Sequence, residues 1–212
     1  SQQRVADYIF ARVAELGVKE VFLLPGGGAM HLVDALGQNP DITFIPTHHE
    51  QAAAIAAEAY SRVNETLGVA LVTTGPGATN ALTAVAGAWI ESVPLLIISG
   101  QVKRADMKAD SGVRQMGPQE VDIVSMVKPI TKYAVTVDEP DNIGLYLDKA
   151  LHEAMTGRKG PVWLDVPLDV QASLIEPEEL ARDESNTDNE SDCALELDEV
   201  IQLIQQAQRP II

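Results

Sequence analysis

The sequence predicts an α/β fold in which a doubly wound, six-stranded, mostly parallel sheet carries helices on both faces. Strand and helix patterns alternate from the start of the chain, as consecutive βαβ units require. The predicted strands are continuous apolar runs, which is typical of parallel strands covered on both sides. With 46% hydrophobic residues among 212, the chain is also long and apolar enough for one such core.

The first predicted element is a helix over residues 4–16, because Val5, Ile9 and Val13 recur at helical spacing before a glycine. The apolar run of residues 20–24 predicts the first strand, which a Pro-Gly-Gly-Gly turn closes. The same reasoning gives, in chain order, helix 29–36, strand 42–45, helix 51–63, strand 69–73, helix 79–90, strand 95–99, a long polar loop 103–117, helix 120–126, strand 130–135, helix 142–155 and strand 162–166.

Acidic residues gather in one segment near the C-terminal end. The net charge is −16, and residues 176–199 alone contain eleven acidic residues and one basic residue. We therefore expect a globular domain over residues 1–175 and a solvated acidic linker over 176–195. The start of a truncated central domain is expected over 196–212. There, residues 197–207 predict an amphipathic helix and 209–212 the beginning of a strand.

The bulk properties exclude several classes of protein. No apolar run reaches membrane-spanning length, and the N-terminus lacks the basic-then-apolar pattern of a signal peptide. The single cysteine, Cys193, excludes an internal disulfide and fits a reducing cytoplasm, which is the expected location. Nucleic-acid binding is not expected, because it requires a basic surface that neutralises phosphates.

Ligands of doubly wound sheets bind beyond the carboxyl ends of the strands, so the residues that follow strands are the candidates for function. In residues 24–28 the glycines allow either a close approach to a ligand or simply a tight turn. This segment is not a dinucleotide fingerprint, because His31 occupies the third glycine position. In residues 73–80 a Gly-Pro-Gly turn precedes Asn80, which we expect to begin or cap the next helix; a plain capped turn is the alternative.

The remaining strand end, residues 47–57, places Glu50 in the first turn of a helix that is almost all alanine. One interpretation is that Glu50 only complements the helix dipole, which stabilises the helix by roughly a few tenths of a kcal/mol. A metal site with His48 and His49 is disfavoured, because adjacent residues at a strand end point to opposite sides. Small neighbouring side chains let a ligand approach closely and leave a carboxylate poorly solvated, which favours a functional role.

Together and in this order, these segments resemble the pyrimidine-binding domain of the acetolactate synthase and pyruvate oxidase group of thiamine-diphosphate enzymes. The resemblance covers nearly all of residues 1–175 and is strongest to the large catalytic subunit of acetolactate synthase. The motifs that carry it are Val21-Phe22 to Pro25-Gly26-Gly27, His49-Glu50-Gln51-Ala52-Ala53, Gly75-Pro76-Gly77-Ala78-Thr79-Asn80, Ser92-Val93-Pro94-Leu95, Ser99-Gly100-Gln101-Val102, Gln119-Glu120-Val121-Asp122, and Gly160-Pro161-Val162 to Asp165-Val166-Pro167.

The resemblance implies a catalytic role for Glu50. This carboxyl would hydrogen-bond a ring nitrogen of the aminopyrimidine and favour its imino form, which removes the proton from the thiazolium carbon. Gln119 would reach toward the thiazolium and the substrate, and Thr73 and Gly75 would mainly support their turn. The full set implied to bind thiamine diphosphate is Pro25, Gly26, Glu50, Thr73, Gly75, Pro76, Asn80 and Gln119.

For the complete enzyme, the resemblance implies carboligation of pyruvate or another 2-keto acid by a homodimer or tetramer, with each active site between two subunits. Magnesium and the diphosphate would be held by a Gly-Asp-Gly motif followed at a distance by Asn-Asn. Neither motif occurs in this chain, so the magnesium ligands are expected in a C-terminal domain. FAD is compatible with the resemblance, but no motif here supports it. The chain alone is expected to bind thiamine diphosphate weakly and to show no turnover.

Two features depart from the acetolactate synthase pattern. Pro118 stands where those enzymes usually have an aromatic residue, and the loop 103–117 differs from their short acidic form. The four basic residues of this loop could meet a substrate carboxylate, or could form a solvated face. The alternatives are therefore a thiamine-diphosphate decarboxylase or oxidase for another 2-keto acid, and a non-catalytic module that keeps only the fold.

Overall fold

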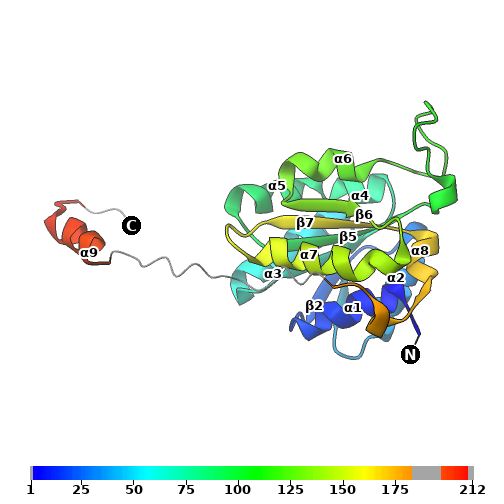
Figure 1. Cartoon of the computed structure of the whole chain (residues 1–212). Helices are drawn as coiled ribbons and strands as arrows, with labels where there is room; N and C mark the ends of the chain where they lie inside the picture. Colours follow the sequence, from blue (N-terminus) through cyan, green and yellow to red (C-terminus); the bar gives the residue numbers. More distant parts are fainter. Residues whose placement is uncertain (1, 183–196, 210–212) are drawn as a thin grey trace.

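The structure is a computed structural model that describes residues 2–182 and 197–209 (Figure 1). The predictions made for residues 183–196, which include Cys193 and most of the acidic linker, lie outside the described residues, as does most of the strand expected near the end. The predicted amphipathic helix is present as α9, Leu197–Gln206. None of the helices in the described parts is both long and apolar enough to cross a membrane.

Six parallel strands form the central sheet, in the order β3-β2-β4-β5-β7-β6. This all-parallel arrangement confirms the predicted fold class. The strands β4, β5 and β7 are buried along their whole length, which explains why their sequences are mostly apolar and do not alternate with exposed polar residues. The strands are β2 Glu20–Leu23, β3 Thr43–Pro46, β4 Gly68–Val72, β5 Leu95–Gln101, β6 Tyr133–Thr136 and β7 Pro161–Pro167.

Helices cover both faces of the sheet and enclose two separate apolar cores (Figure 1). One core lies beneath α1 Val5–Glu15, α2 Met30–Gln38 and α7 Ile143–Met155, next to the short α8 Leu168–Ala172. The other lies beneath α3 Glu50–Asn64, α4 Pro76–Asn80, α5 Leu82–Glu91 and α6 Ile123–Val127. Alternate residues of β4 supply the two cores, Val69 and Leu71 on one face and Ala70 and Val72 on the other.

Three predicted elements differ in the structure. The helix expected at 79–90 is broken at Ala81, so that α4 and α5 are separate helices. The strand expected at 130–135 begins only at Tyr133, because a 3-10 turn over Lys128–Ile130 delays it. The helix expected from residue 120 begins at Ile123, where Asp122 caps it by accepting from the Ser125 amide at 3.1 Å.

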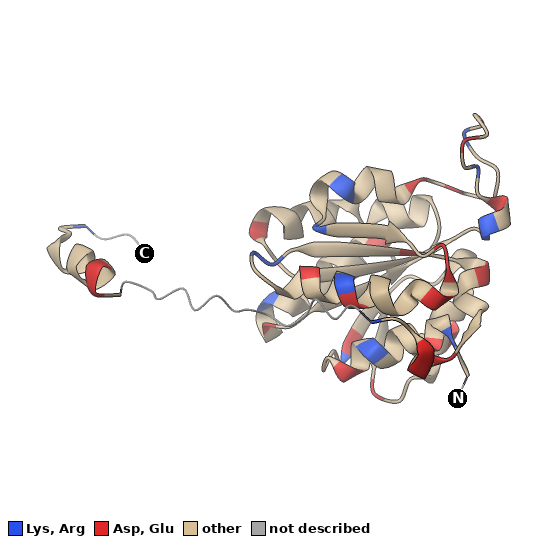
Figure 2. Cartoon of the chain, viewed as in Figure 1, with Lys and Arg blue, Asp and Glu red and all other residues tan. Residues whose placement is uncertain are grey.

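A small second sheet ties the two ends of the domain together. Strand β1, Gln3–Arg4, pairs antiparallel with β8, Leu174–Ile175, and the sequence did not predict either strand. Short 3-10 helices connect the remaining segments: η1 Gly27–Ala29, η2 Arg104–Asp106, η3 Lys128–Ile130, η4 Pro140–Asn142 and η5 Pro177–Glu179. Acidic and basic residues are interspersed over the helices of the described domain (Figure 2).

Candidate functional site

The candidate site lies at the carboxyl ends of β2, β3 and β4. The strand order changes direction between β2 and β4, since β3 follows β2 on one side while β4 and β5 follow on the other. Such a switch point opens a crevice beyond the strand ends, where doubly wound folds bind their ligands. Three of the segments identified in the sequence, residues 24–28, 47–57 and 73–80, meet at this point.

Glu50 is the first residue of α3, and its carboxyl group is held in a fixed position. The residue is buried, with 8% exposed, and its carboxyl group lies against the turn that follows β4. The Nδ2 of Asn80 donates a hydrogen bond to Glu50 Oε2 at 2.9 Å. The preceding residue, His49, caps the helix by accepting the Gln51 amide at 3.1 Å through Nδ1. The expectation of a poorly solvated carboxyl at position 50 is thus confirmed.

Asn80 has a different structural role from the one expected. It is the last residue of α4, so it neither begins nor caps the following helix. The helix starts earlier because Pro76 occupies its first position, where a missing N–H costs nothing. Asn80 therefore lies one helical turn beyond Pro76, and its amide reaches back to the carboxyl of Glu50.

The turn after β4 needs glycine at two positions. Gly75 has a φ of +63°, a left-handed conformation that glycine adopts readily. A Cβ at Gly77 would lie 3.1 Å from Glu50 Oε1 and 2.7 Å from the Thr73 side chain. A side chain here would therefore press directly on the buried carboxyl group.

The turn after β2 interlocks with the turn after β4. A Cβ at Gly26 would lie 2.5 Å from the side chain of Thr73, and a Cβ at Gly28 would lie 1.8 Å from Thr74 Oγ1. That hydroxyl is buried, and it has no hydrogen-bond partner among the residues that the structure describes. Because these glycines have no side chains, the side chains of Thr73 and Thr74 pack directly against the backbone of the first turn. Pro25, at the start of the first turn, is exposed.

Gln119 approaches the same turn from the long loop. Its φ is +60°, which is uncommon for a residue with a side chain. A Cβ at Gly75 would lie 1.8 Å from the carbonyl oxygen of Gln119, so the two backbones are in direct contact. The structure thus brings together Gly26 with Thr73, Glu50 with Asn80, and Gly75 with Gln119, whereas Pro25 and Pro76 are exposed on the rim.

Sequence reasoning did not identify a buried polar cluster beside the site. Asp165, in β7, is 1% exposed and accepts hydrogen bonds from Ser99 Oγ at 2.6 Å and Gln101 Nε2 at 3.0 Å. Burial raises the pKa of Asp165 to about 7, although these hydrogen bonds oppose the shift. The feature of the sequence that could have revealed this cluster is the single carboxylate, Asp165, within the apolar run of residues 161–167.

The cluster borders a polar pocket of about 320 Å³, at the carboxyl ends of β5, β6 and β7. Gln101, Thr136 and Asp165 contribute to its wall, and so do Lys108 and Glu120 of the long loop segment. Of the four basic residues noted in that loop, Arg104 already pairs with Asp169 at 2.8 Å. Its guanidinium therefore anchors the loop to α8.

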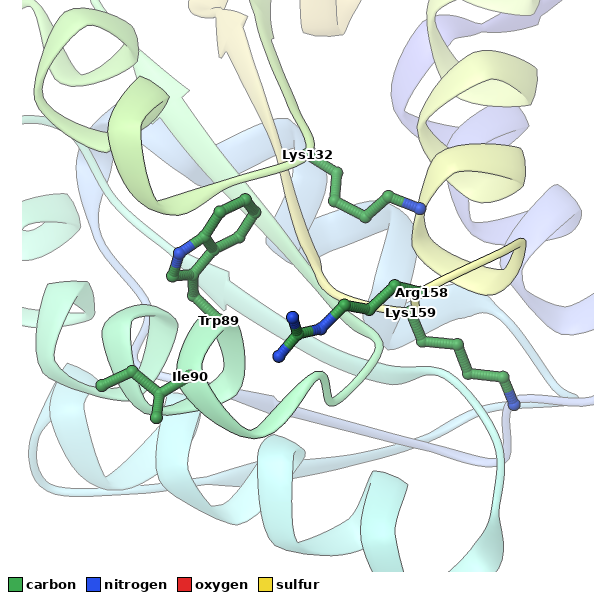
Figure 3. A pocket seen from close by; sticks show the side chains of 5 residues that line it. All are labelled: Trp89, Ile90, Lys132, Arg158 and Lys159. Carbon is green, nitrogen blue, oxygen red and sulfur yellow. The ribbon is translucent and has the colours of Figure 1, made fainter.

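A larger pocket, of about 400 Å³, lies at the opposite end of the strands (Figure 3) and is lined by Trp89, Ile90, Lys132, Arg158 and Lys159. Its cations do not converge on one point. Arg158 donates to Ser92 Oγ at 2.7 Å, and Lys132 donates to the carbonyl oxygens of Glu153 and Thr156 at the end of α7. Lys132 and Lys159 point away from Trp89 in Figure 3. We therefore do not assign the functional site to this pocket.

Comparison with known proteins identifies the family to which the chain belongs. The family described as "Thiamine pyrophosphate enzyme, N-terminal TPP binding domain" matches residues 3–126. The mitochondrial acetolactate synthase of Schizosaccharomyces pombe is 42% identical over 158 residues, which are 74% of this chain and 23% of that protein. The acetolactate synthase large subunit of Lactococcus lactis is 40% identical over 165 residues, 78% of this chain and 28% of its own.

Acetolactate synthase isozyme 3 large subunit of Escherichia coli is 38% identical over 165 residues, again 78% of this chain and 28% of that protein. The chain thus spans about a quarter of the length of these relatives. The resemblance inferred from the strand-end motifs is confirmed. The chain belongs to the thiamine pyrophosphate enzymes and contains their N-terminal cofactor-binding domain.

Proposed function

We propose that this chain is the pyrimidine-binding domain of a thiamine-diphosphate-dependent carboligase that acts on pyruvate or another 2-keto acid, as acetolactate synthase does. The observation that carries the proposal is the buried carboxyl of Glu50, held by Asn80 at the switch point of the sheet. The relatives named acetolactate synthase support the choice of carboligation.

The residues at the switch point fit an aminopyrimidine ring. Such a ring requires a carboxyl oxygen at hydrogen-bonding distance from a ring nitrogen and a surface without bulky side chains. Oε1 of Glu50 lies beside Gly77, where the chain has no side chain, while Oε2 is occupied by Asn80. When bound, thiamine diphosphate supplies the carbanion chemistry at its thiazolium carbon.

Each residue of the site then has a defined task. Glu50 would share a proton with the ring nitrogen of bound thiamine diphosphate, and its burial would strengthen that hydrogen bond because the local dielectric is low. Asn80 fixes the orientation of the carboxyl group by donating to Oε2. Gln119 would face the thiazolium and the substrate. The walls of the pyrimidine site are formed by Pro25, Gly26, Thr73, Gly75 and Pro76.

In our proposal, the complete active site also needs a second domain that binds the diphosphate and its magnesium ion. No group of three or more His, Cys, Asp or Glu side chains is placed to hold a metal ion within residues 2–182 and 197–209. We propose that magnesium and the diphosphate are bound by a separate domain, and that the enzyme is a homodimer or tetramer with a cytoplasmic location.

The test is the substitution Glu50→Gln in the complete polypeptide, assayed for turnover of pyruvate and of other 2-keto acids. We expect folding to be retained and turnover to fall by at least about 100-fold, since the amide cannot share a proton with the ring nitrogen. The matched control is Glu65→Gln at the exposed end of the same helix, which should leave turnover unchanged. Full turnover in Glu50→Gln would refute the catalytic role of this residue.

Product analysis with the same protein distinguishes the alternatives. A decarboxylase releases an aldehyde and an oxidase consumes an electron acceptor, whereas a carboligase joins two carbonyl compounds. Pro118 and the loop of residues 103–117, which depart from the acetolactate synthase pattern, are the features that favour another 2-keto acid. If the complete polypeptide turns over no 2-keto acid, the non-catalytic module is the better description.

A further inference from the structure

Glu120 is a buried carboxylate that lies next to Gln119 but is not part of the pyrimidine site. Only 7% of this residue is exposed. Its Oε1 accepts the backbone amide of Lys108 at 2.6 Å, and its Oε2 accepts those of Met116 at 2.9 Å and Gly117 at 3.3 Å. Hydrogen bonds to a charged acceptor are about twice as strong as neutral ones, so this carboxylate joins the two ends of the segment 108–117 firmly.

The backbone on both sides of Gln119 is also fixed. The amide of Glu120 donates to the carbonyl of Gly117 at 3.2 Å, which closes a tight turn around positions 118 and 119. On the other side, Gln101 Nε2 donates to the carbonyl of Val121 at 3.0 Å and is itself held by Asp165. Gln119 thus lies between two anchored points.

This anchoring accounts for the unfavourable conformation of Gln119. A side-chain-bearing residue at φ +60° persists only where its surroundings impose that conformation. Here the conformation places the carbonyl of Gln119 against Gly75, in the turn that leads to Pro76 and Asn80. The position of Gln119 relative to the pyrimidine site therefore depends on the hydrogen bonds of Glu120.

We propose that Glu120 is a positioning residue: its carboxylate clamps the segment 108–117 and thereby holds Gln119 in its left-handed conformation against Gly75. The consequence for activity rests on the proposed function, in which Gln119 faces the thiazolium and the substrate. The clamp itself rests only on the hydrogen bonds and backbone angles of this structure.

Glu120→Gln tests the clamp in the complete polypeptide. The substitution keeps the size of the side chain, but its amide nitrogen must face at least one of the three backbone N–H donors. Hydrogen exchange followed by mass spectrometry should show amide exchange in the segment 108–117 at least about tenfold faster. Asp122→Asn is the matched control, because Asp122 caps α6 and accepts hydrogen bonds from Ser125. Amide exchange in the segment 108–117 of this variant should equal that of the wild type.

A double-mutant cycle with Gln119→Ala tests the link to activity. If Glu120 acts through Gln119, Glu120→Gln lowers kcat/KM by about tenfold, and the double variant is no worse than Gln119→Ala alone. Unchanged exchange in Glu120→Gln, or losses that multiply in the double variant, would overturn the proposal. If Gln119→Ala keeps full turnover, the role given to Gln119 under the proposed function fails, and the exchange measurement still decides on the clamp.

Discussion

Replacing Asp165 by asparagine should change how the stability of the chain depends on pH. Burial raises the pKa of this carboxyl from 3.8 to about 7 in the folded chain. The folded state therefore binds a proton more tightly than the unfolded state between these two values. Stability is greatest where the carboxyl is protonated in both states and falls as the pH rises toward 7, because ionisation then favours unfolding.

The magnitude follows from the difference between the two pKa values. One pKa unit corresponds to about 1.4 kcal/mol, so the full effect is about 4 kcal/mol, and about 3 kcal/mol of it falls between pH 5 and pH 8. Asparagine has no proton to lose in this range. The free energy of unfolding of the wild type should therefore decrease relative to that of Asp165→Asn by about 3 kcal/mol over this interval.

Urea unfolding at pH 5, 6, 7 and 8 measures the difference in unfolding free energy between the wild type and Asp165→Asn. The fluorescence of Trp163 is the probe, because its indole Nε1 donates to Ser99 Oγ beside the carboxyl of Asp165. Asp169→Asn is the matched control. Partial burial opposes the shift at Asp169, but hydrogen bonds from Arg104 lower its pKa, so its contribution is constant between pH 5 and 8. A difference between the wild type and Asp165→Asn that does not change with pH would refute the reasoning.

Three further substitutions, two of them with a comparison variant, test the packing by urea unfolding. Gly75→Ala should lower the free energy of unfolding by at least about 2 kcal/mol, because Gly75 has a positive φ and an added Cβ would lie 1.8 Å from the carbonyl oxygen of Gln119. Gly87→Ala, at an open position within a helix, should raise the free energy of unfolding by about 1 kcal/mol. Thr74→Val should leave stability unchanged or increase it, since the buried hydroxyl of Thr74 has no hydrogen-bond partner among the described residues. Thr131→Val removes the 3.0 Å hydrogen bond from the Thr131 hydroxyl to the carbonyl of Val127, so it should destabilise the fold by about 1 kcal/mol. Asp148→Asn should cost about 2 kcal/mol, because the buried carboxylate pairs with two arginines. A change in the free energy of unfolding in the opposite direction would contradict the structural interpretation of the substituted residue.

Much of the fold could be predicted because parallel strands leave a simple pattern. The strands β4, β5 and β7 are buried on both faces, so their sequences are apolar without alternation. The site could be located because parallel strands place their carboxyl ends at one edge of the sheet. Residues as distant in sequence as Gly26, Glu50 and Asn80 could then be expected to lie near one another.

Contacts between distant segments could not be predicted from local patterns. The break at Ala81 leaves a continuous helical pattern in the sequence, yet Asn80 bonds to Glu50 from a separate helix. Glu120 looks like the first residue of a helix, but its carboxylate binds three amides of the preceding loop. Both features depend on which segments the fold brings together.

The interlocked turns at the switch point restrict where this protein can vary. A side chain added at Gly26, Gly28, Gly75 or Gly77 would collide with a neighbouring turn. By contrast, Gly112, near the tip of the long loop, has nothing within 4 Å of an added Cβ. Space therefore does not limit substitution at the tip of the loop; at Gly112 the φ of +78° limits it instead, because residues with side chains rarely adopt that conformation. The two regions are therefore constrained in different ways: contact between neighbouring turns restricts the glycines at the switch point, whereas backbone conformation alone restricts Gly112.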